Sequence, residues 1–232
     1  MTITYRSNGG CSIVSGTSIN LTAPSGIVVG DLLVCLIGAI RGAGITGVTF
    51  TQEGGWTEDY TEIVTTGSGA STGRLSAFSK IAVSADTSEA SYTWGMTSSP
   101  DALFGVVFRI DGHRTSGYYD VADGVWVVSS GTTVNYPQLT QAANNELLLY
   151  FGVEDAGVDT ASTPGVTEVS DVSGMTACYE LDATSGTTTA RTTTWSGTST
   201  ERAGIIAAYK SPAATAAVTG TATASITEAD IV

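Results

Sequence analysis

Positively charged residues and histidine are scarce in this sequence. Its 232 residues include 9 lysines and arginines against 22 aspartates and glutamates, which gives a formal net charge of −13. Proteins that bind the phosphate backbone of nucleic acids use a positive surface, and anionic membranes attract the same kind of surface. We therefore expect no nucleic-acid partner and no binding to anionic membranes. The negative charge favours solubility at high copy number.

Cysteines and long apolar runs are also few. Cys11, Cys35 and Cys178 form an odd set without the spacing of a metal site. Cys35 and Cys178 lie in strand-like segments, where we expect small buried residues rather than disulfide partners. The apolar runs near 32–40 and 203–209 are too short to span a bilayer, and the N-terminus lacks a signal-peptide pattern. These features predict three free thiols, no membrane insertion and folding in a reducing cytoplasm.

Helical periodicity is the third absence. The best helical candidate, Ser84 to Ala90, allows one or two turns, so we expect helix below about 10 % instead of the usual third. Threonine (37), serine (25) and glycine (28) are abundant instead, and short apolar segments alternate with turn residues. Strands are predicted at 12–22, 31–40, 46–50, 60–65, 74–82, 91–95, 102–110, 125–129, 146–153, 165–169, 176–181, 191–195 and 203–210. This pattern predicts an all-β fold, an antiparallel β-sandwich.

Several of these strands are apolar without interruption, which indicates burial on both faces. The central example is Gly30-Asp31 followed by the run 32–37, and similar runs occupy 103–108, 147–151 and 203–209. The side chains expected at the heart of the core are Leu33, Cys35, Ile37, Phe104, Val106, Leu148, Tyr150 and Ile206.

The composition changes near residue 211, which divides the chain into a β-sandwich domain at 1–210 and an Ala/Thr-rich linker or arm at 211–232. Residues 211–225 contain almost no core-forming side chains. Ile226, Ile231 and Val232 are β-formers, so we expect the arm to add a strand to a neighbouring sheet edge or to begin a truncated accessory module.

Short motifs along residues 1–210 occur in a recognisable order. They are Gly30-Asp31-Leu32-Leu33-Val34, Gly55-Trp56-Thr57, Phe78-Ser79-Lys80-Ile81-Ala82, Phe108-Arg109-Ile110-Asp111-Gly112 and Ile206-Ala207-Ala208-Tyr209-Lys210. This layout resembles the jelly-roll-type β-sandwich modules of tailed-bacteriophage head and tail proteins. The resemblance implies a structural protein of the virion, assembled in the host cytoplasm. Its place would be the capsid surface, as a decoration protein or head fibre, or the tail tip or tail fibre. The implied partners are other virion proteins and further copies of the chain.

No catalytic constellation stands out, so we expect no enzyme activity and no cofactor. His113, the only histidine, lies in a turn and has no nucleophile-elbow serine to accompany it. Carboxylates cluster at 154–159 (Glu154, Asp155, Asp159) and 120–123 (Asp120, Asp123), but neither loop has the spacing of an EF-hand. Solvated turn acids are the default interpretation, and a bound calcium ion is the alternative. No pair of acids can be assigned to glycoside hydrolysis.

Two tryptophans suggest a second class of function. Trp126 and Trp195 lie in more polar surroundings than Trp56 and Trp94, and flat rings of this kind could stack on sugars. The alternative function is therefore a carbohydrate-binding module that recognises a host-surface glycan, which could coexist with a role in host attachment. The competing interpretation of both rings is core or interface packing, because tryptophan is highly buried on average.

Overall fold

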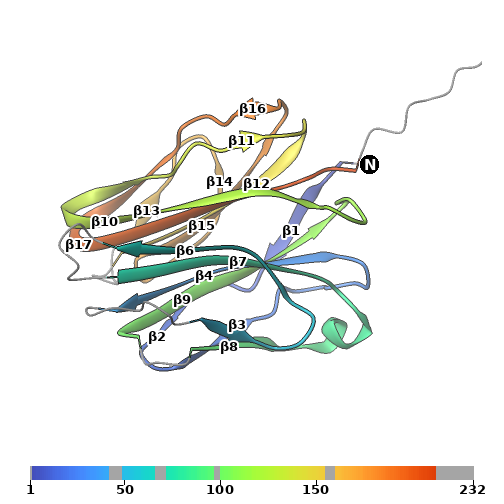
Figure 1. Ribbon diagram of the computed structural model, residues 1–232, viewed down its shortest axis with the longest axis horizontal. Coiled ribbons are helices and arrows are strands. Elements are labelled where there is room, and N and C mark those ends of the chain that lie inside the picture. Colours follow the sequence, from blue (N-terminus) through green and yellow to red (C-terminus); the bar gives the residue numbers. More distant parts are fainter. Residues whose placement is uncertain (1, 42–48, 66–71, 97–99, 155–159, 213–232) are drawn as a thin grey trace, which may run out of the picture.

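The fold is a sandwich of two antiparallel sheets of six strands each, which pack face to face (Figure 1). The computed structural model describes residues 2–41, 49–65, 72–96, 100–154 and 160–212. Within these residues there is no α-helix, and the segment 84–90 holds one 3-10 turn, η1 (Ser84–Ser88). The predicted all-β antiparallel sandwich and the low helix content are confirmed. Residues 213–232 of the predicted arm lie outside the described residues.

Each sheet is built from one half of the chain. The N-terminal sheet has the strand order β1-β9-β4-β7-β6, with β2 also paired to β9. Its strands are β1 (Thr4–Asn8), β2 (Ser12–Val14), β4 (Leu32–Arg41), β6 (Thr57–Thr65), β7 (Thr72–Ile81) and β9 (Ala102–Asp111). The C-terminal sheet has the order β10-β17-β12-β15-β14, with β13 also paired to β17. Its strands are β10 (Tyr119–Asn135), β12 (Glu146–Glu154), β13 (Ala161–Ser162), β14 (Thr167–Val172), β15 (Met175–Asp182) and β17 (Thr192–Tyr209).

Smaller elements cover the outer faces of both sheets. A three-stranded sheet of β3 (Ser18–Thr22), β8 (Ser91–Met96) and β5 (Phe50–Gln52) packs against the N-terminal sheet. On the opposite side of the sandwich lies a two-stranded sheet of β11 (Thr140–Gln141) and β16 (Gly186–Thr187), as Figure 1 shows. Nearby, Tyr136 and Leu139 pack on the outer face of the C-terminal sheet. Central strands are thus covered on both faces, which explains their uninterrupted apolar runs.

The core consists of three clusters, and strand β4 shows how one strand serves two of them. Leu32, Val34 and Leu36 face the gap between the two large sheets, whereas the alternate residues face the small outer sheet. All eight predicted core side chains are buried. Phe104 and Val106 lie between the large sheets, Leu33, Cys35 and Ile37 under the small sheet, and Leu148, Tyr150 and Ile206 on the outer face of the C-terminal sheet.

The two halves of the chain share one topology. Five strands of each half, numbered in chain order, lie in the order 1-5-2-4-3: β1-β9-β4-β7-β6 in the first half and β10-β17-β12-β15-β14 in the second. Two pairs of shorter strands follow the same scheme, since β3 pairs with β8 and β11 pairs with β16. The fold is therefore a tandem pair of similar halves, 4–111 and 119–209, packed against each other.

Register irregularities fall at equivalent positions of the two halves. The β1–β9 pairing skips Arg6, and the β10–β17 pairing skips Asp120. Likewise, the β6–β7 pairing skips Asp59 and the β14–β15 pairing skips Val169. The residues before this second bulge are also alike, Gly55-Trp56-Thr57-Glu58 and Gly165-Val166-Thr167-Glu168. A bulge places an extra residue opposite one partner, so both halves aim these side chains in the same way.

Some strand boundaries differ from the sequence-based prediction. The segment 12–22 is divided into β2 and β3 around Gly16, which has a φ of 140°. The segments 191–195 and 203–210 are parts of the single long strand β17, and 125–129 is the middle of β10. The sequence pattern misses β1, β11, β13 and β16, because these short strands contain few apolar residues. The segment 46–50 lies mostly outside the described residues.

Both ends of the described chain meet at one end of the sandwich, which we call the terminal pole. The Ile3 amide donates a hydrogen bond to Ser211 Oγ at 3.1 Å. Figure 1 shows the N-terminus beside the end of β17. The opposite pole is marked by the start of β9 at Ala102 and the end of β12 at Glu154.

Candidate functional site

The two tryptophans proposed for glycan contact lie in the interior. Trp126 is 9 % exposed and packs between the large sheets, with its ring centroid 6.5 Å from that of Phe104. Trp195 is 2 % exposed, and its Nε1 donates a hydrogen bond to the Gly174 carbonyl at 3.0 Å. Neither ring presents an open face on which a sugar could stack, so the burial favours the core-packing interpretation of both residues.

His113 is half-buried instead of solvated, and its ring meets the edge of Tyr118 at 5.9 Å. Its Nδ1 is buried without a hydrogen-bond partner in the described part of the chain. Burial lowers the pKa of His113, which keeps the ring neutral at physiological pH. No serine hydroxyl is hydrogen-bonded to the ring among the described contacts, so the structure offers no catalytic pairing for it there.

The two acid clusters named in the sequence analysis lie in different environments. Asp155 and Asp159 lie outside the described residues, and Glu154 is buried at the end of β12. Asp123 Oδ1 accepts hydrogen bonds from its neighbouring Gly124 amide and from the Tyr60 hydroxyl. Among the described residues, no group of three or more His, Cys, Asp or Glu side chains is placed to hold a metal ion.

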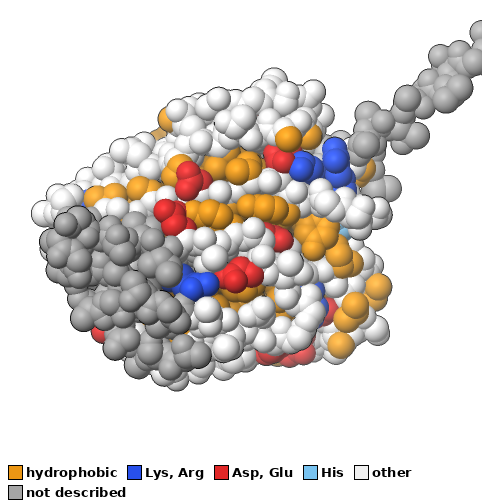
Figure 2. All heavy atoms as spheres, viewed as in Figure 1, with side chains coloured by type: hydrophobic (Ala, Val, Ile, Leu, Met, Phe, Trp, Pro, Cys, Tyr) orange, Lys and Arg blue, Asp and Glu red, His pale blue; other side chains and the backbone are white. Residues whose placement is uncertain are grey.

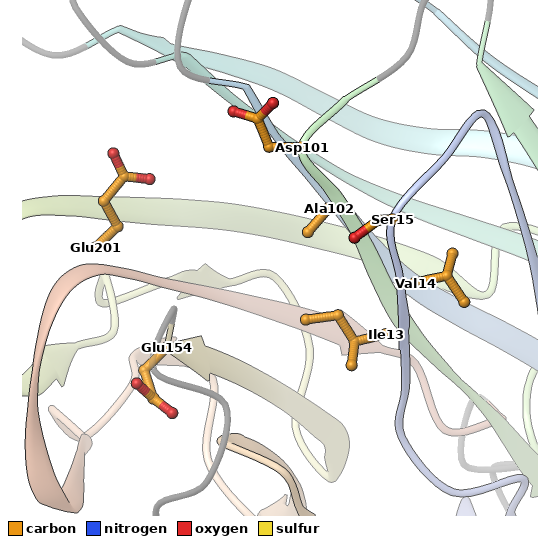
Figure 3. A pocket seen from close by; sticks show the side chains of 7 residues that line it. All are labelled: Ile13, Val14, Ser15, Asp101, Ala102, Glu154 and Glu201. Carbon is orange, nitrogen blue, oxygen red and sulfur yellow. The ribbon is translucent and has the colours of Figure 1, made fainter.

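A pocket of about 500 Å³ lies beside the start of β9 and the end of β12, and Figure 3 shows the side chains that line it. Its walls come from the β2 region, the start of β9, the end of β12 and a part of β17 far from its C-terminal end. The lining residues are Ile13, Val14, Ser15, Asp101, Ala102, Glu154 and Glu201. Three of these residues, Asp101, Glu154 and Glu201, carry carboxyl groups.

At the terminal pole, Ser211 is the centre of a group of hydrogen bonds that joins three segments of the chain. Its Oγ donates to the Asn145 carbonyl at 2.5 Å and accepts from the Ile3 amide. Its carbonyl accepts from Arg114 Nε at 2.9 Å. Three separate segments thus fix the residue from which the arm continues. We call Ser211 and these partners the arm root.

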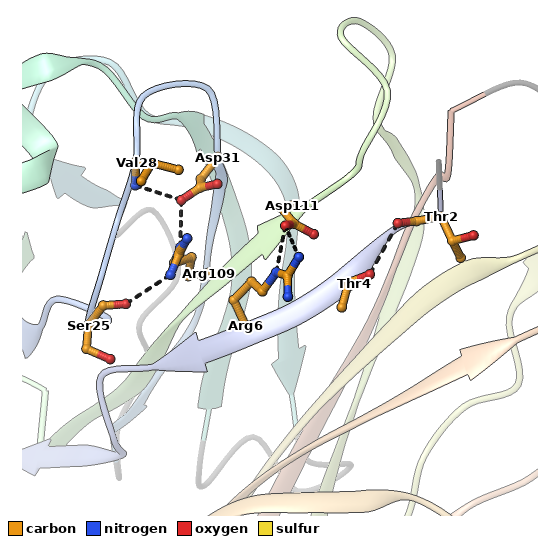
Figure 4. Close-up of polar contacts among 8 residues, drawn as sticks. All are labelled: Thr2, Thr4, Arg6, Ser25, Val28, Asp31, Arg109 and Asp111. Carbon is orange, nitrogen blue, oxygen red and sulfur yellow. Dashed lines mark hydrogen bonds and ion pairs between the residues drawn. The ribbon is translucent and has the colours of Figure 1, made fainter.

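In the first half of the chain, two ion pairs close the terminal pole (Figure 4). Arg6 is paired with Asp111, and Arg109 Nε lies 2.6 Å from Asp31 Oδ2. Asp31 also accepts the Val28 amide at 2.8 Å. The carboxylate therefore ties the turn before β4 to strand β9.

The second half places a different set of charges at the same pole. Asp120 from β10, Glu146 from β12 and Lys210 after β17 make up the Lys–Asp–Glu cluster. Lys210 Nζ lies 2.6 Å from Asp120 Oδ1, with side-chain exposures of 17 % and 7 %, and Glu146 is fully buried. Asp120 Oδ2 accepts the Ala142 amide at 2.8 Å, and Glu146 Oε1 accepts the Ala143 amide at 3.1 Å. Backbone amides thus hold both carboxyl groups in place.

The two carboxyl groups of this cluster differ in pKa, so one of them holds a proton under conditions in which the other is ionised. Burial, together with a hydrogen bond to Asp120, raises the pKa of Glu146 to about 7. Burial is the largest single influence on Asp120 and acts in the same direction, but the hydrogen bonds from Lys210, the Ala142 amide and Glu146, together with the charge of Lys210, outweigh it and lower the pKa of Asp120. Two adjacent carboxyl groups resist double ionisation, so Asp120 carries the charge and Glu146 retains the proton up to about neutral pH.

The internal repeat explains why the clusters differ. Arg6 and Asp120 occupy equivalent bulges, so the ion pair of the first half recurs in the second with its charges exchanged. Asp31 and Glu146 are also equivalent, because each precedes the core residues of the second strand of its half and each accepts the amide three residues earlier. Register places Ala208 where the first half has Arg109. Glu146 therefore lacks the cation that Asp31 has.

Sequence reasoning does not bring this cluster together, because its members are widely separated along the chain. Its only local signal is an acidic residue immediately before an apolar strand, which occurs at both Asp31 and Glu146. All three cysteines are free, as predicted. Within the described residues there is no helix with the length and hydropathy needed to span a bilayer. Comparisons with protein-family models, with curated proteins and with solved structures find no match.

Proposed function

We propose that this chain is a non-enzymatic structural component of a tailed-phage virion, exposed on the capsid surface or at the tail tip or fibre. The observation that carries the proposal is the arm root, where the N-terminal segment, the loop at Asn145 and Arg114 all hold Ser211. A body that anchors the base of its own C-terminal arm so firmly suits a protein that is held in an assembly through that arm.

Two further features support the same function. The body is layered on both sides of its large sheets, so that few strands expose both a face and an edge. The face in Figure 2 consists mainly of uncharged side chains and backbone, with isolated charged side chains between them. Such a surface, with a net charge of −13 for the chain, favours dispersed particles at high copy number.

Deletion of residues 213–232 tests the proposal, because it removes the arm and retains Ser211. We expect the truncated protein to keep its β-sheet circular dichroism and its Tm within a few degrees, since every core strand precedes the deletion. We also expect it to lose incorporation into particles and self-association in analytical ultracentrifugation. A matched full-length control carries serine at Ile226, Ile231 and Val232.

The control separates strand pairing from mere length. If the arm lends a strand, the triple serine variant should assemble as poorly as the deletion. Normal particle incorporation by the deletion variant would contradict a role for the arm. An antibody to the chain that labels no part of the parent particle would contradict the virion assignment itself.

A further inference from the structure

We propose that Lys210 and Asp120 are joined by an amide bond between Nζ and Cγ, formed within the folded chain with Glu146 as the proton-transfer residue. This modification goes beyond the proposed function and does not depend on it. It would fasten the last strand of the sandwich, β17, to the neighbouring strand β10 immediately before the arm.

The fold brings the reacting groups into contact. Strand β17 lies between β10 and β12, and Tyr209 is paired with Tyr119 on one side and with Leu147 on the other. The three residues of the Lys–Asp–Glu cluster are each adjacent to one of these paired residues, so they share one level of the sheet. Lys210 Nζ lies 2.6 Å from Asp120 Oδ1, and the carboxyl carbon is one bond further. The amine nitrogen is therefore in direct contact with the carboxyl group that it would attack, as a near-attack conformer requires.

The reacting groups are also held in place. The Ala142 amide fixes Asp120 Oδ2, and the Tyr119 carbonyl accepts a second hydrogen bond from Lys210 Nζ at 3.3 Å. Such fixation converts a slow reaction between two solutes into an intramolecular step with a high effective concentration. The remaining exposure of Lys210 leaves a route by which a product water molecule can depart.

The reaction balances without any further reagent. A proton passes from the Lys210 ammonium group to the Asp120 carboxylate, which leaves a neutral amine beside a neutral carboxyl group. The amine lone pair attacks Cγ, and the C=O electron pair moves onto oxygen. When the tetrahedral carbon collapses, the C–OH bond breaks and the hydroxyl leaves as water. One C–N bond has formed, one C–O bond has broken, and no oxidation or reduction has occurred.

Glu146 is suited to transfer the protons of this reaction. Its carboxylic acid donates a proton to the departing hydroxyl and then accepts the proton that the attacking nitrogen loses, so it ends as it began. An acid can do this only if it is neutral at the start and touches the reacting group. Burial and the hydrogen bond with Asp120 raise the pKa of Glu146 to about 7, which meets the first condition. The same hydrogen bond is the contact with the reacting group, which meets the second condition.

The rest of the molecule offers two internal comparisons. In the first half the charges are exchanged, so the cation paired with Asp111 is the guanidinium of Arg6, and Arg109 Nε lies 2.6 Å from Asp31 Oδ2. A guanidinium stays protonated in proteins and is no nucleophile. The second lysine of the chain, Lys80, lies 2.7 Å from Asp86, but the other hydrogen bonds to Asp86 come from the Val83 amide and the Tyr92 hydroxyl. Neither donor is a carboxylic acid.

Intact-mass measurement of the denatured full-length protein, after incubation at pH 7, tests the bond directly. We expect the wild-type chain to weigh less than its sequence by one water molecule, whereas Lys210→Arg and Glu146→Gln keep the sequence mass. Lys210→Arg preserves a cation beside Asp120, and Glu146→Gln preserves the shape of the side chain. Removal of Met1 would shift all three proteins equally.

Tryptic digestion locates the bond. Trypsin should not cleave after Lys210, and residues 203–232 should remain covalently linked to the peptide 115–191, which contains Asp120. Cyclisation at an Asp-Gly step also releases water, but it would leave these two peptides separate. This control keeps a loss of mass from being attributed to the wrong reaction.

Three results would overturn the inference. A wild-type mass equal to that of the unmodified sequence would exclude the bond, whether or not the variants fold. A loss of water that persists in Lys210→Arg would place the reaction elsewhere. Complete bond formation in a folded Glu146→Gln variant would exclude the proposed proton transfer. Circular dichroism of each variant establishes that it is folded.

Discussion

Replacement of Trp126 by alanine distinguishes a core tryptophan from a ligand-binding one. The ring is 9 % exposed and lies in the cluster between the two large sheets, against Phe104. Truncation of a buried aromatic side chain to alanine costs about 3–5 kcal/mol. For a domain of this size, that corresponds to a decrease in Tm of about 6–20 °C.

A second substitution sharpens the test, because Trp126 fills the space above Gly73. A Cβ atom at Gly73 would lie 2.3 Å from Trp126 Cε3, so Gly73→Ala should cost about 1–3 kcal/mol in the wild-type protein. In the Trp126→Ala background the added methyl group enters vacated space, and its cost should largely disappear. The difference between the two backgrounds is the coupling free energy of a double-mutant cycle.

Urea denaturation followed by circular dichroism measures all four proteins, and Leu181→Ala serves as the exposed control. Leu181 is 47 % exposed, so its replacement should change the free energy of unfolding by no more than about 0.5 kcal/mol. A cost below about 1 kcal/mol for Trp126→Ala, or an unchanged cost of Gly73→Ala in that background, would refute the packing argument. Glycan binding that is lost in a fully stable Trp126→Ala protein would restore the carbohydrate-binding hypothesis.

Three further predictions concern pH, buried charge and thiols. Burial raises the pKa of Asp59 to about 6, so between pH 4 and 6 the folded state holds a proton that the unfolded state releases. The free energy of unfolding should therefore fall by about 2 kcal/mol as the pH rises from 4 to 6. Asp59→Asn should reduce the pH slope of stability by about this amount in urea titrations across the window, and an unchanged slope would count against the prediction. Arg202 donates hydrogen bonds to four backbone carbonyls, those of Ser129, Gly131, Thr133 and Ser199. Arg202→Met should therefore lower the free energy of unfolding by at least about 3 kcal/mol in the same assay, and a decrease below about 1 kcal/mol would contradict this prediction. Thiol titration of the denatured, unreduced protein should count three free thiols, whereas a count of one would mean a disulfide.

The buried strands could be predicted from the sequence because their cause is local. A run such as 32–37 has no polar edge, so it must be covered on both faces wherever it lies. The sequence does not say what provides the cover. In the structure two different layers do so, with alternate residues of β4 in different clusters. The sequence therefore predicts which residues are buried in the core, but it does not predict the small outer sheets that cover them.

The internal repeat was not predicted because it is mainly a repeat of register, and many equivalent residues differ. Arg6 and Asp120 are equivalent and opposite in charge, and Arg109 corresponds to Ala208. The sequence matches at equivalent positions are short: Gly-X-Thr-Glu at 55–58 and 165–168, an acid followed by two leucines at 31–33 and 146–148, and glycine followed by two β-branched residues at 105–107 and 204–206. The Lys–Asp–Glu cluster was missed for a related reason, since Asp120 resembles a turn acid until β17 places Lys210 beside it.

The two halves meet the same requirement at the terminal pole in different ways. Each must join its first and last strands across a bulge, where backbone pairing is interrupted and a side chain is free to form an ion pair. In the first half, Asp31 has its own arginine, so both carboxylates of that cluster are paired with cations. In the second half, the change to Ala208 leaves one lysine for two carboxyl groups. The surplus acid must be neutral to remain buried, and a neutral acid beside a Lys–Asp pair is what proton transfer during amide formation requires. The half with fewer cations is thus the half that can become covalently closed, at the residue that precedes the arm.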